Sequence, residues 1–516
     1  MDLKKRFCTD TKKEGPTMKN KLLFFIYFAA LVSVLFAQTS ADQVTETPAA
    51  EAAAGGDSSK AVSTLEEQRL RIIRYGTDAE IANLIKILRN EQPSDRSEAK
   101  KITLLDQEII AVTEKTKNRA ILSGVFGYFA DRELESLEKR AVLVVEERDH
   151  EAGETVNAAI YYLGKIQATG ARRIITEIIK GEENRFLSVA IRSLGQIAEK
   201  EGQAETAEYL IDYYTNREPG DENRRLIVAA LGDIKAKEGT AFLVSIAENE
   251  DEKIPLRMAA LEALAKIDDT VGLPAIIAAV SSKDPNVRSS AVGALAPFPG
   301  DEVDFAIIEA FRDSYYRSRI AAAKAAGERK LTAAVPFLRF RCENDEVPAV
   351  RDEAIKALGL IGGNDAETTL KELFKERKNS DRIRINAGEM LLGHGTSDYV
   401  TEVVIEMDEA KAKNQTALYN GFLRILGGSK SPKLEELARR FFAGGGVVEK
   451  SYALDICSNN NFQGLVDEIR RLTDPKNGSL SRKSILLLEK WGLPDTAGAS
   501  PAPQVPVPNG GAGSSQ

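Results

Sequence analysis

A short pattern recurs along most of this chain and restricts it to repeat folds. Each copy has an alanine, three further residues, then Leu-Gly or Leu-Ala, and a turn. The ten intervals between the first and last copies cover 325 residues, or 32.5 residues per unit. The small residue of each copy, or its replacement, is Gly164, Gly195, Gly232, Ala265, Ala296, Gly327, Gly359, Gly393, Gly427, Cys457 and Glu489. A fixed period of this length predicts units that bury their apolar faces against their neighbours.

The units are predicted to be helical. Val303, Ala306, Ile307, Ala310 and Phe311 follow the spacing of one apolar stripe on an amphipathic helix. We find no segment with the alternation typical of a strand. Glycine costs a helix interior about 1 kcal/mol relative to alanine, so the recurring small residue predicts a close approach between helices.

Two units carry the clearest resemblance to a known family. Residues 284–296 begin with Asp284-Pro285, an N-cap followed by proline at the first helical position, and residues 350–362 repeat their Arg, Ala and Leu spacing. These units resemble HEAT repeats, most of all the short type named for phycobilisome lyases. The resemblance covers residues 155–491 well and residues 64–154 loosely. It implies an all-α fold, an α-solenoid of about 11–13 HEAT-like pairs of antiparallel helices.

Two other repeat classes share this period. Ankyrin repeats carry a Thr-Pro-Leu-His turn in each unit, whereas this chain has two histidines in total. Tetratricopeptide repeats place Leu-Gly inside the first helix, whereas here it falls at a helix end. The HEAT-like interpretation is therefore preferred.

A row of arginines runs in phase with the repeat. Each lies eight residues before the small residue of its unit: Arg257, Arg288, Arg319 and Arg351. One interpretation is a strip that binds anions. The favoured interpretation is hydrogen bonding between repeats, with nearby acids as the partners: Asp284, Asp313, Asp345 and Glu346.

Double aromatics also recur, at Tyr161-Tyr162, Tyr213-Tyr214, Tyr315-Tyr316 and Phe441-Phe442. We expect one member of each pair to face the core. An exposed partner would make a good anchor for another protein, although packing is the favoured role for both members.

Both ends of the chain differ from the repeats. A basic segment, Met18–Lys21, precedes 16 mostly apolar residues, Leu22–Ala37. A membrane span needs about 20 such residues, so this stretch predicts a cleavable secretory signal in residues 1–37, with Met18 as the alternative start. Cleavage after Ala41 and retention as an anchor are the alternatives. If the segment is not a signal, the protein works in the cytosol.

The remaining sequence is divided by composition. Residues 38–62 are poor in large apolar side chains and predict a flexible linker. Residues 63–154 depart from the period and predict divergent N-terminal repeats or a cap. Residues 155–494 form the predicted HEAT-like solenoid, and residues 495–516 predict a disordered tail rich in Pro and Gly.

Few residues offer catalytic or metal-binding chemistry. His150 and His394 lie some seven repeats apart, which is too far to share a metal in a solenoid. Cys342 and Cys457 lie about four repeats apart and are not expected to form a disulfide, because its Cα atoms must lie within ~7 Å. Cys457 occupies the packed repeat position and is expected to be a buried thiol. The iron enzyme deoxyhypusine hydroxylase has similar repeats but needs several His-Glu dipeptides, and this chain has one, at His150.

These patterns predict a binding protein with no catalytic, cofactor-binding or metal-binding residues. The net charge of -8 disfavours nucleic acid as a partner. We expect an exported, non-catalytic scaffold or adaptor for protein partners, periplasmic or secreted, with no stable membrane span once the signal is removed. The alternative is an envelope enzyme or lyase-like protein with an acidic active site.

Overall fold

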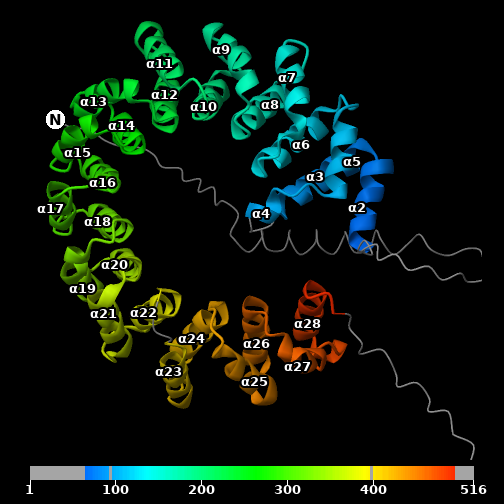
Figure 1. Ribbon diagram of the computed structural model, residues 1–516, viewed down its shortest axis with the longest axis vertical. Helices are drawn as coiled ribbons and strands as arrows, with labels where there is room; N and C mark the ends of the chain where they lie inside the picture. Colours follow the sequence, from blue (N-terminus) through cyan, green and yellow to red (C-terminus); the bar gives the residue numbers. More distant parts are fainter. Residues whose placement is uncertain (1–63, 92–95, 395–398, 494–516) are drawn as a thin grey trace, which may run out of the picture. The chain divides into compact units, whose positions relative to one another are not determined.

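The computed structural model describes residues 64–91, 96–394 and 399–493, and the predicted signal, linker and tail lie outside these ranges. Helices occupy most of the described residues, and no strand occurs among them. The helices form thirteen consecutive pairs, in which each helix packs against its partner and against the adjoining pairs (Figure 1). The all-α solenoid predicted from the repeat is confirmed.

The pairs build two layers, which we call layer A and layer B after the first and second helix of each pair. Layer A contains α2 (Thr64–Tyr75), α5 (Leu104–Thr113), α7 (Glu138–Glu146), α9 (Arg172–Lys180), α11 (Gln203–Arg217), α13 (Thr240–Glu248), α15 (Leu273–Ala279), α17 (Asp301–Ala310), α19 (Val335–Asn344), α21 (Gly363–Lys375), α23 (Val400–Ala412), α25 (Leu434–Gly444) and α27 (Val466–Arg470). Layer B contains α3 (Asp78–Asn90), α6 (Arg119–Asp131), α8 (Gly153–Lys165), α10 (Leu187–Ala198), α12 (Asp221–Ile234), α14 (Ile254–Ile267), α16 (Pro285–Ala294), α18 (Tyr316–Glu328), α20 (Pro348–Ile361), α22 (Asp381–His394), α24 (Thr416–Gly428), α26 (Val447–Asn460) and α28 (Ser479–Lys490). One short helix, α4 (Arg96–Ala99), lies between the first two pairs, within the segment that departs from the period.

Successive layer B helices pack closely because the recurring small residue faces the next helix. A Cβ atom on Gly232 would lie 2.7 Å from the Cα of Ala263 on α14. At Gly195 the corresponding contact, to the Cβ of Ala230, is 2.8 Å. The prediction is wrong at Gly393, which is exposed and has no atom within 4 Å of such a Cβ.

The apolar side chains of all thirteen pairs join in one core that runs from pair to pair. Its largest fully buried members are Tyr162, Phe126, Phe129, Phe186, Phe298, Phe311, Phe374 and Phe422. Each pair therefore depends on its neighbours for burial, as expected for a solenoid.

Candidate protein-binding surface

Two of the recurring arginines tie neighbouring pairs together. Arg288 on α16 donates from Nε and Nη2 to the carboxylate of Asp313, at 2.8 and 3.0 Å. Arg319 on α18 holds Asp345 in the same two-pronged manner, at 2.7 and 2.9 Å. Each aspartate lies in the loop of the following pair. The interpretation as hydrogen bonding between repeats is confirmed at these two positions, which we call the arginine rungs.

The rungs are partly or fully removed from water. Only 6% of the Arg319 side chain and none of Asp345 is exposed, whereas Arg288 and Asp313 expose 20% and 12%. Burial, the largest single influence, opposes ionisation of both aspartates, but hydrogen bonds from the arginines and from the backbone amides of Tyr315 and Val347 together outweigh it and hold the pKa of Asp313 and of Asp345 below the ordinary value. Both carboxylates therefore stay ionised well into the acidic range.

Two of the predicted acid partners have other roles. The Asp284 carboxylate caps α16, where it accepts hydrogen bonds from the backbone amides of residues 286 and 287, so it is not free to bind an arginine. Glu346 is exposed and makes no hydrogen bond or ion pair with a described residue. Arg257 donates instead to the carbonyl of Ala247, within its own pair, at 3.0 Å.

A further buried ion pair joins α5 to the end of α6 within the second helical pair, and sequence reasoning did not identify it. Arg132 contacts Asp106 at 2.5 Å, with 5% and 0% of their side chains exposed. Arg132 also donates to the carbonyl of Ala99 at the end of α4. Tyr128 donates to Asp106, and burial together with this carboxylate raises its pKa. The short insert is thus anchored to α6.

The double aromatics serve mainly as packing groups. Tyr162 is fully buried, and its hydroxyl donates to the carbonyl of Leu134. Tyr213 and Tyr214 are both buried, so this pair has no exposed member. Phe441 is buried and Phe442 is half-buried. Tyr315 and Tyr316 are both half-buried, so the expectation of one core-facing member is wrong for this pair. None of the eight aromatic side chains is exposed. Among the described residues the exposed aromatics lie elsewhere, on layer A: Tyr75 at 83%, Phe305 at 65% and Phe340 at 55% exposure.

The few residues with metal-binding or redox chemistry lie apart. His150 is exposed in the loop before α8, and His394 ends α22, its side chain being outside the described residues. Cys342 and Cys457 are buried free thiols, and burial raises the pKa of Cys457 to about 12. Within the described ranges no group of three or more His, Cys, Asp or Glu residues is placed to hold a metal ion. None of the helices there combines the length and apolarity needed to cross a membrane.

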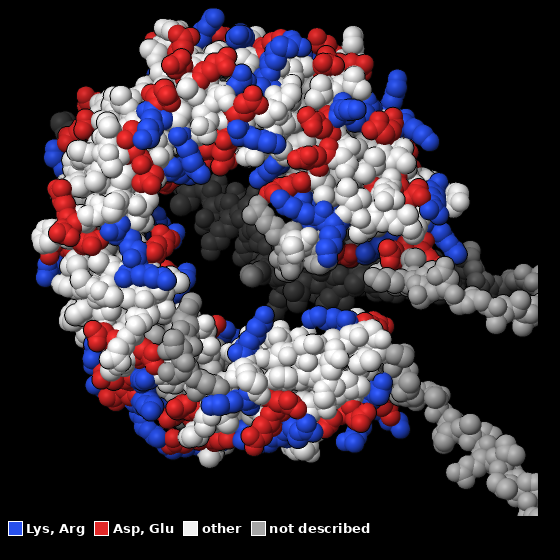
Figure 2. All heavy atoms as spheres, in the orientation of Figure 1, with Lys and Arg blue, Asp and Glu red and all other residues white. Residues whose placement is uncertain are grey.

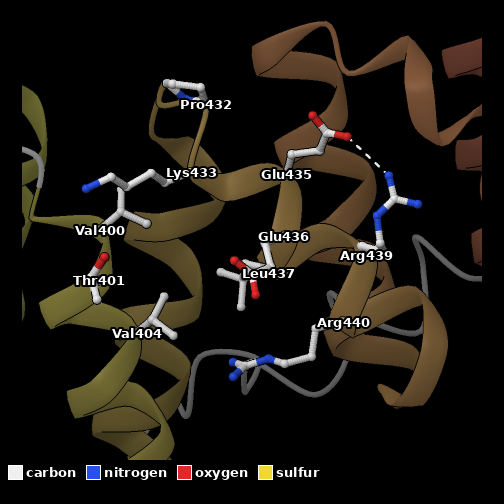
Figure 3. A pocket seen from close by; sticks show the side chains of 10 residues that line it. All are labelled: Val400, Thr401, Val404, Pro432, Lys433, Glu435, Glu436, Leu437, Arg439 and Arg440. Atoms are coloured by element: carbon white, nitrogen blue, oxygen red, sulfur yellow. Dashed lines mark hydrogen bonds and ion pairs between the residues drawn. The ribbon is translucent and has the colours of Figure 1, made fainter.

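A cavity of about 510 Å³ lies between α23 and α25 of layer A, and the repeat pattern did not predict it. Val400, Thr401 and Val404 of α23 face Leu437 and Arg440 of α25 across it (Figure 3). Its floor is aliphatic, since Val400 and Leu437 are buried and Val404 is half-buried. The rim is charged, and its residues are Lys433, Glu435, Glu436, Arg439 and Arg440. This combination suits an apolar side chain of another protein that carries polar groups beside it.

Charges of both signs are interspersed over the face shown in Figure 2. Many of them form ion pairs between adjacent pairs of helices, for example Lys266 with Asp233 in layer B and Arg440 with Asp408 in layer A. Exposed ion pairs of this kind contribute little stability.

The architecture and the arginine rungs define the class of this protein as an α-solenoid of HEAT repeats. A family model described as "Spirochaete HEAT repeat protein" matches residues 73–485, and the chain belongs to that family. No protein of curated function matches the sequence.

Several solved structures match the chain at low identity and low TM-score. Kap121p bound to the extreme C-terminus of the protein phosphatase Cdc14p is 11% identical with a TM-score of 0.40, over 93% of this chain and 57% of that chain. Importin beta is 12% identical with a TM-score of 0.34, over 82% and 64%. Human deoxyhypusine hydroxylase is 16% identical with a TM-score of 0.22, over 60% and 96%. The chain spans 52–57% of the Kap121p chains it matches.

Proposed function

We propose that this protein is an exported, non-catalytic scaffold that binds other proteins in the cell envelope. The observation that carries the proposal is the stack of thirteen helical pairs among the described residues, whose two layers expose a mixed-charge surface. Solenoids use such extended surfaces for binding, because each added pair lengthens the surface without changing its neighbours' structure. The cavity between α23 and α25 supplies one place where an apolar anchor of a partner fits.

Export is the second part of the proposal and rests on the sequence of residues 18–37. A basic segment followed by a short apolar run is typical of a secretory signal, and a periplasmic or secreted location follows from it. Mass spectrometry of the N-terminus of the protein purified from its own cells tests this part. A chain that begins at residue 38 or 42 supports export, and a chain that begins before Leu22 contradicts cleavage.

Photo-crosslinking in cells tests the scaffold itself. A photoreactive amino acid is placed at one exposed position in every pair, including Thr401 at the cavity, with Glu250 in the α13–α14 loop as a reference position. The proposal expects one protein or a few to be captured reproducibly at a continuous run of positions. Capture of no protein at any position would refute a scaffold role.

A further inference from the structure

The arginine rungs end at Arg351, and its guanidinium keeps the geometry of a rung without the carboxylate. In the two complete rungs, Nη1 of the arginine donates to the carbonyl six residues earlier: Arg288 to Ser282 and Arg319 to Asp313, each at 3.0 Å. Arg351 makes the same contact, to the carbonyl of Asp345, at 2.7 Å. Its side chain is therefore held from the same side.

The other edge of the Arg351 guanidinium is open. In the complete rungs Nε and Nη2 grip an aspartate of the next pair, whereas these two atoms of Arg351 make no hydrogen bond with any residue that the structure describes. The aspartate of each complete rung lies three residues before the first residue of the layer B helix of its pair, Asp313 before α18 and Asp345 before α20. Lys378 occupies the same place before α22. A cation thus replaces the carboxylate that would have closed the rung.

The other charged side chains in and beside the α19–α20 and α21–α22 loops either form ion pairs or are exposed to water. Lys378 is 79% exposed and lies 3.6 Å from Glu376, and Arg377 pairs with Glu409. Arg341 lies 3.4 Å from Asp345, which Arg319 already holds, and its Nε is buried without a hydrogen-bond partner among the described residues. Among the described residues, Nε and Nη2 of Arg351 therefore remain donors without an acceptor.

We infer that the open edge of Arg351, together with Lys378, binds a carboxylate presented by a partner protein, as an Asp or Glu side chain in an acidic segment. The complete rungs show that an arginine held in this way grips a planar carboxylate with two parallel hydrogen bonds, the strongest arrangement for this pair of groups. Lys378 adds a positive charge to the same loop and offers Arg351 no carboxylate from within the chain. This inference rests on the proposed protein-binding function and names the chemistry that one part of the surface recognises.

Binding of a fluorescent hexa-glutamate peptide to the full chain, followed by anisotropy at low salt, tests the inference. R351Q is expected to weaken binding by roughly tenfold to hundredfold, the loss expected for a hydrogen bond to a charged group. R351K keeps the charge but loses the two-pronged edge, and it is expected to weaken binding as well. The matched control is R192Q, which removes an exposed arginine of α10 and is expected to leave the affinity unchanged.

A second variant supplies the missing carboxylate of the rung from the chain itself. K378D restores the aspartate of a complete rung, so it is expected to abolish peptide binding and to slow hydrogen exchange in residues 376–384. Equal binding by the wild type, R351Q and K378D would overturn the inference, as would a wild type that does not bind the peptide. Displacement of the peptide by inorganic phosphate at the concentration at which glutarate displaces it would also overturn the assignment to carboxylates.

Crosslinking in cells separates this inference from the scaffold proposal. A photoreactive residue at position 378 is expected to capture a partner, and R351Q is expected to remove the capture. Partners captured elsewhere but not at position 378 would overturn the carboxylate site and leave the scaffold intact. Capture nowhere would overturn the scaffold role and, with it, the biological meaning of the site.

Discussion

Replacing Asp345 by asparagine is predicted to destabilise the middle of the solenoid strongly and locally. The side chain is fully buried, it closes the rung from Arg319, and it also accepts a hydrogen bond from the backbone amide of Val347. Asparagine fits the space but leaves the Arg319 charge without a counter-ion. Breaking a buried ion pair from one side costs about 3–5 kcal/mol.

Hydrogen exchange followed by mass spectrometry is the appropriate assay, because a long repeat array need not unfold in one step. D345N is expected to speed exchange in α18, α19 and α20, and to leave α9 and α10 unchanged. The matched control is D408N, which breaks the exposed pair with Arg440 and is expected to cost on the order of 0.5 kcal/mol. A D345N effect no larger than that of D408N would refute the reasoning about the rungs.

The same ion pair predicts how the stability of the wild type and of D345N changes with pH. The pKa of Asp345 is lower in the folded chain than in the unfolded one. Its contribution to stability is therefore complete above the unfolded value of about 3.9 and is lost as the pH falls through the folded pKa. D345N is expected to lose less stability than the wild type over this acidic range. A steeper acid transition in D345N would contradict the assignment.

Three further predictions follow from packing and burial. Gly232→Val places side-chain atoms against a helix backbone 2.7 Å away and is expected to lower the melting temperature by several degrees. Gly393→Ala, where no atom lies within 4 Å of the added Cβ, is expected to raise the melting temperature slightly. Equal shifts in the two variants would contradict the close packing of layer B. Asp106→Asn leaves the buried Arg132 without its counter-ion and is expected to increase proteolysis of residues 96–104 in the native protein. An unchanged cleavage pattern would argue against the anchored insert. Cys342 and Cys457 are expected to resist iodoacetamide until the chain is unfolded in urea, because burial raises the pKa of both thiols, and rapid alkylation of the native protein would refute their burial.

The repeat made the fold predictable, because one recurring small residue reports the same helix contact in pair after pair. Gly195 and Gly232 behave as the pattern requires. Gly393 does not, because it lies near the exposed end of α22, where no neighbouring helix approaches. A pattern in the sequence marks the equivalent position but not the local end of the helix.

The candidate binding features were predictable only in part. The phase of the arginines indicated rungs, and Arg319 forms one, but Asp284 was assigned to a rung although its position before Pro285 already made it a helix cap. The pair of Arg132 and Asp106 lies outside the repeat and has no copy elsewhere to reveal it. The cavity between α23 and α25 depends on the spacing of two helices, which side-chain packing sets and the period does not record.

Deleting one whole repeat tests the account most directly. Removing residues 297–327 joins Ala296 to the following unit in register, and it places Arg288 beside Asp345 so that a rung forms again. This shortened chain is predicted to fold, with the helical circular dichroism per residue of the parent, while removal of residues 297–312, half a repeat, is predicted to disrupt folding around the junction. Equal behaviour of the two deletions, whether both fold or both fail, would contradict a fold built from interchangeable stacked pairs.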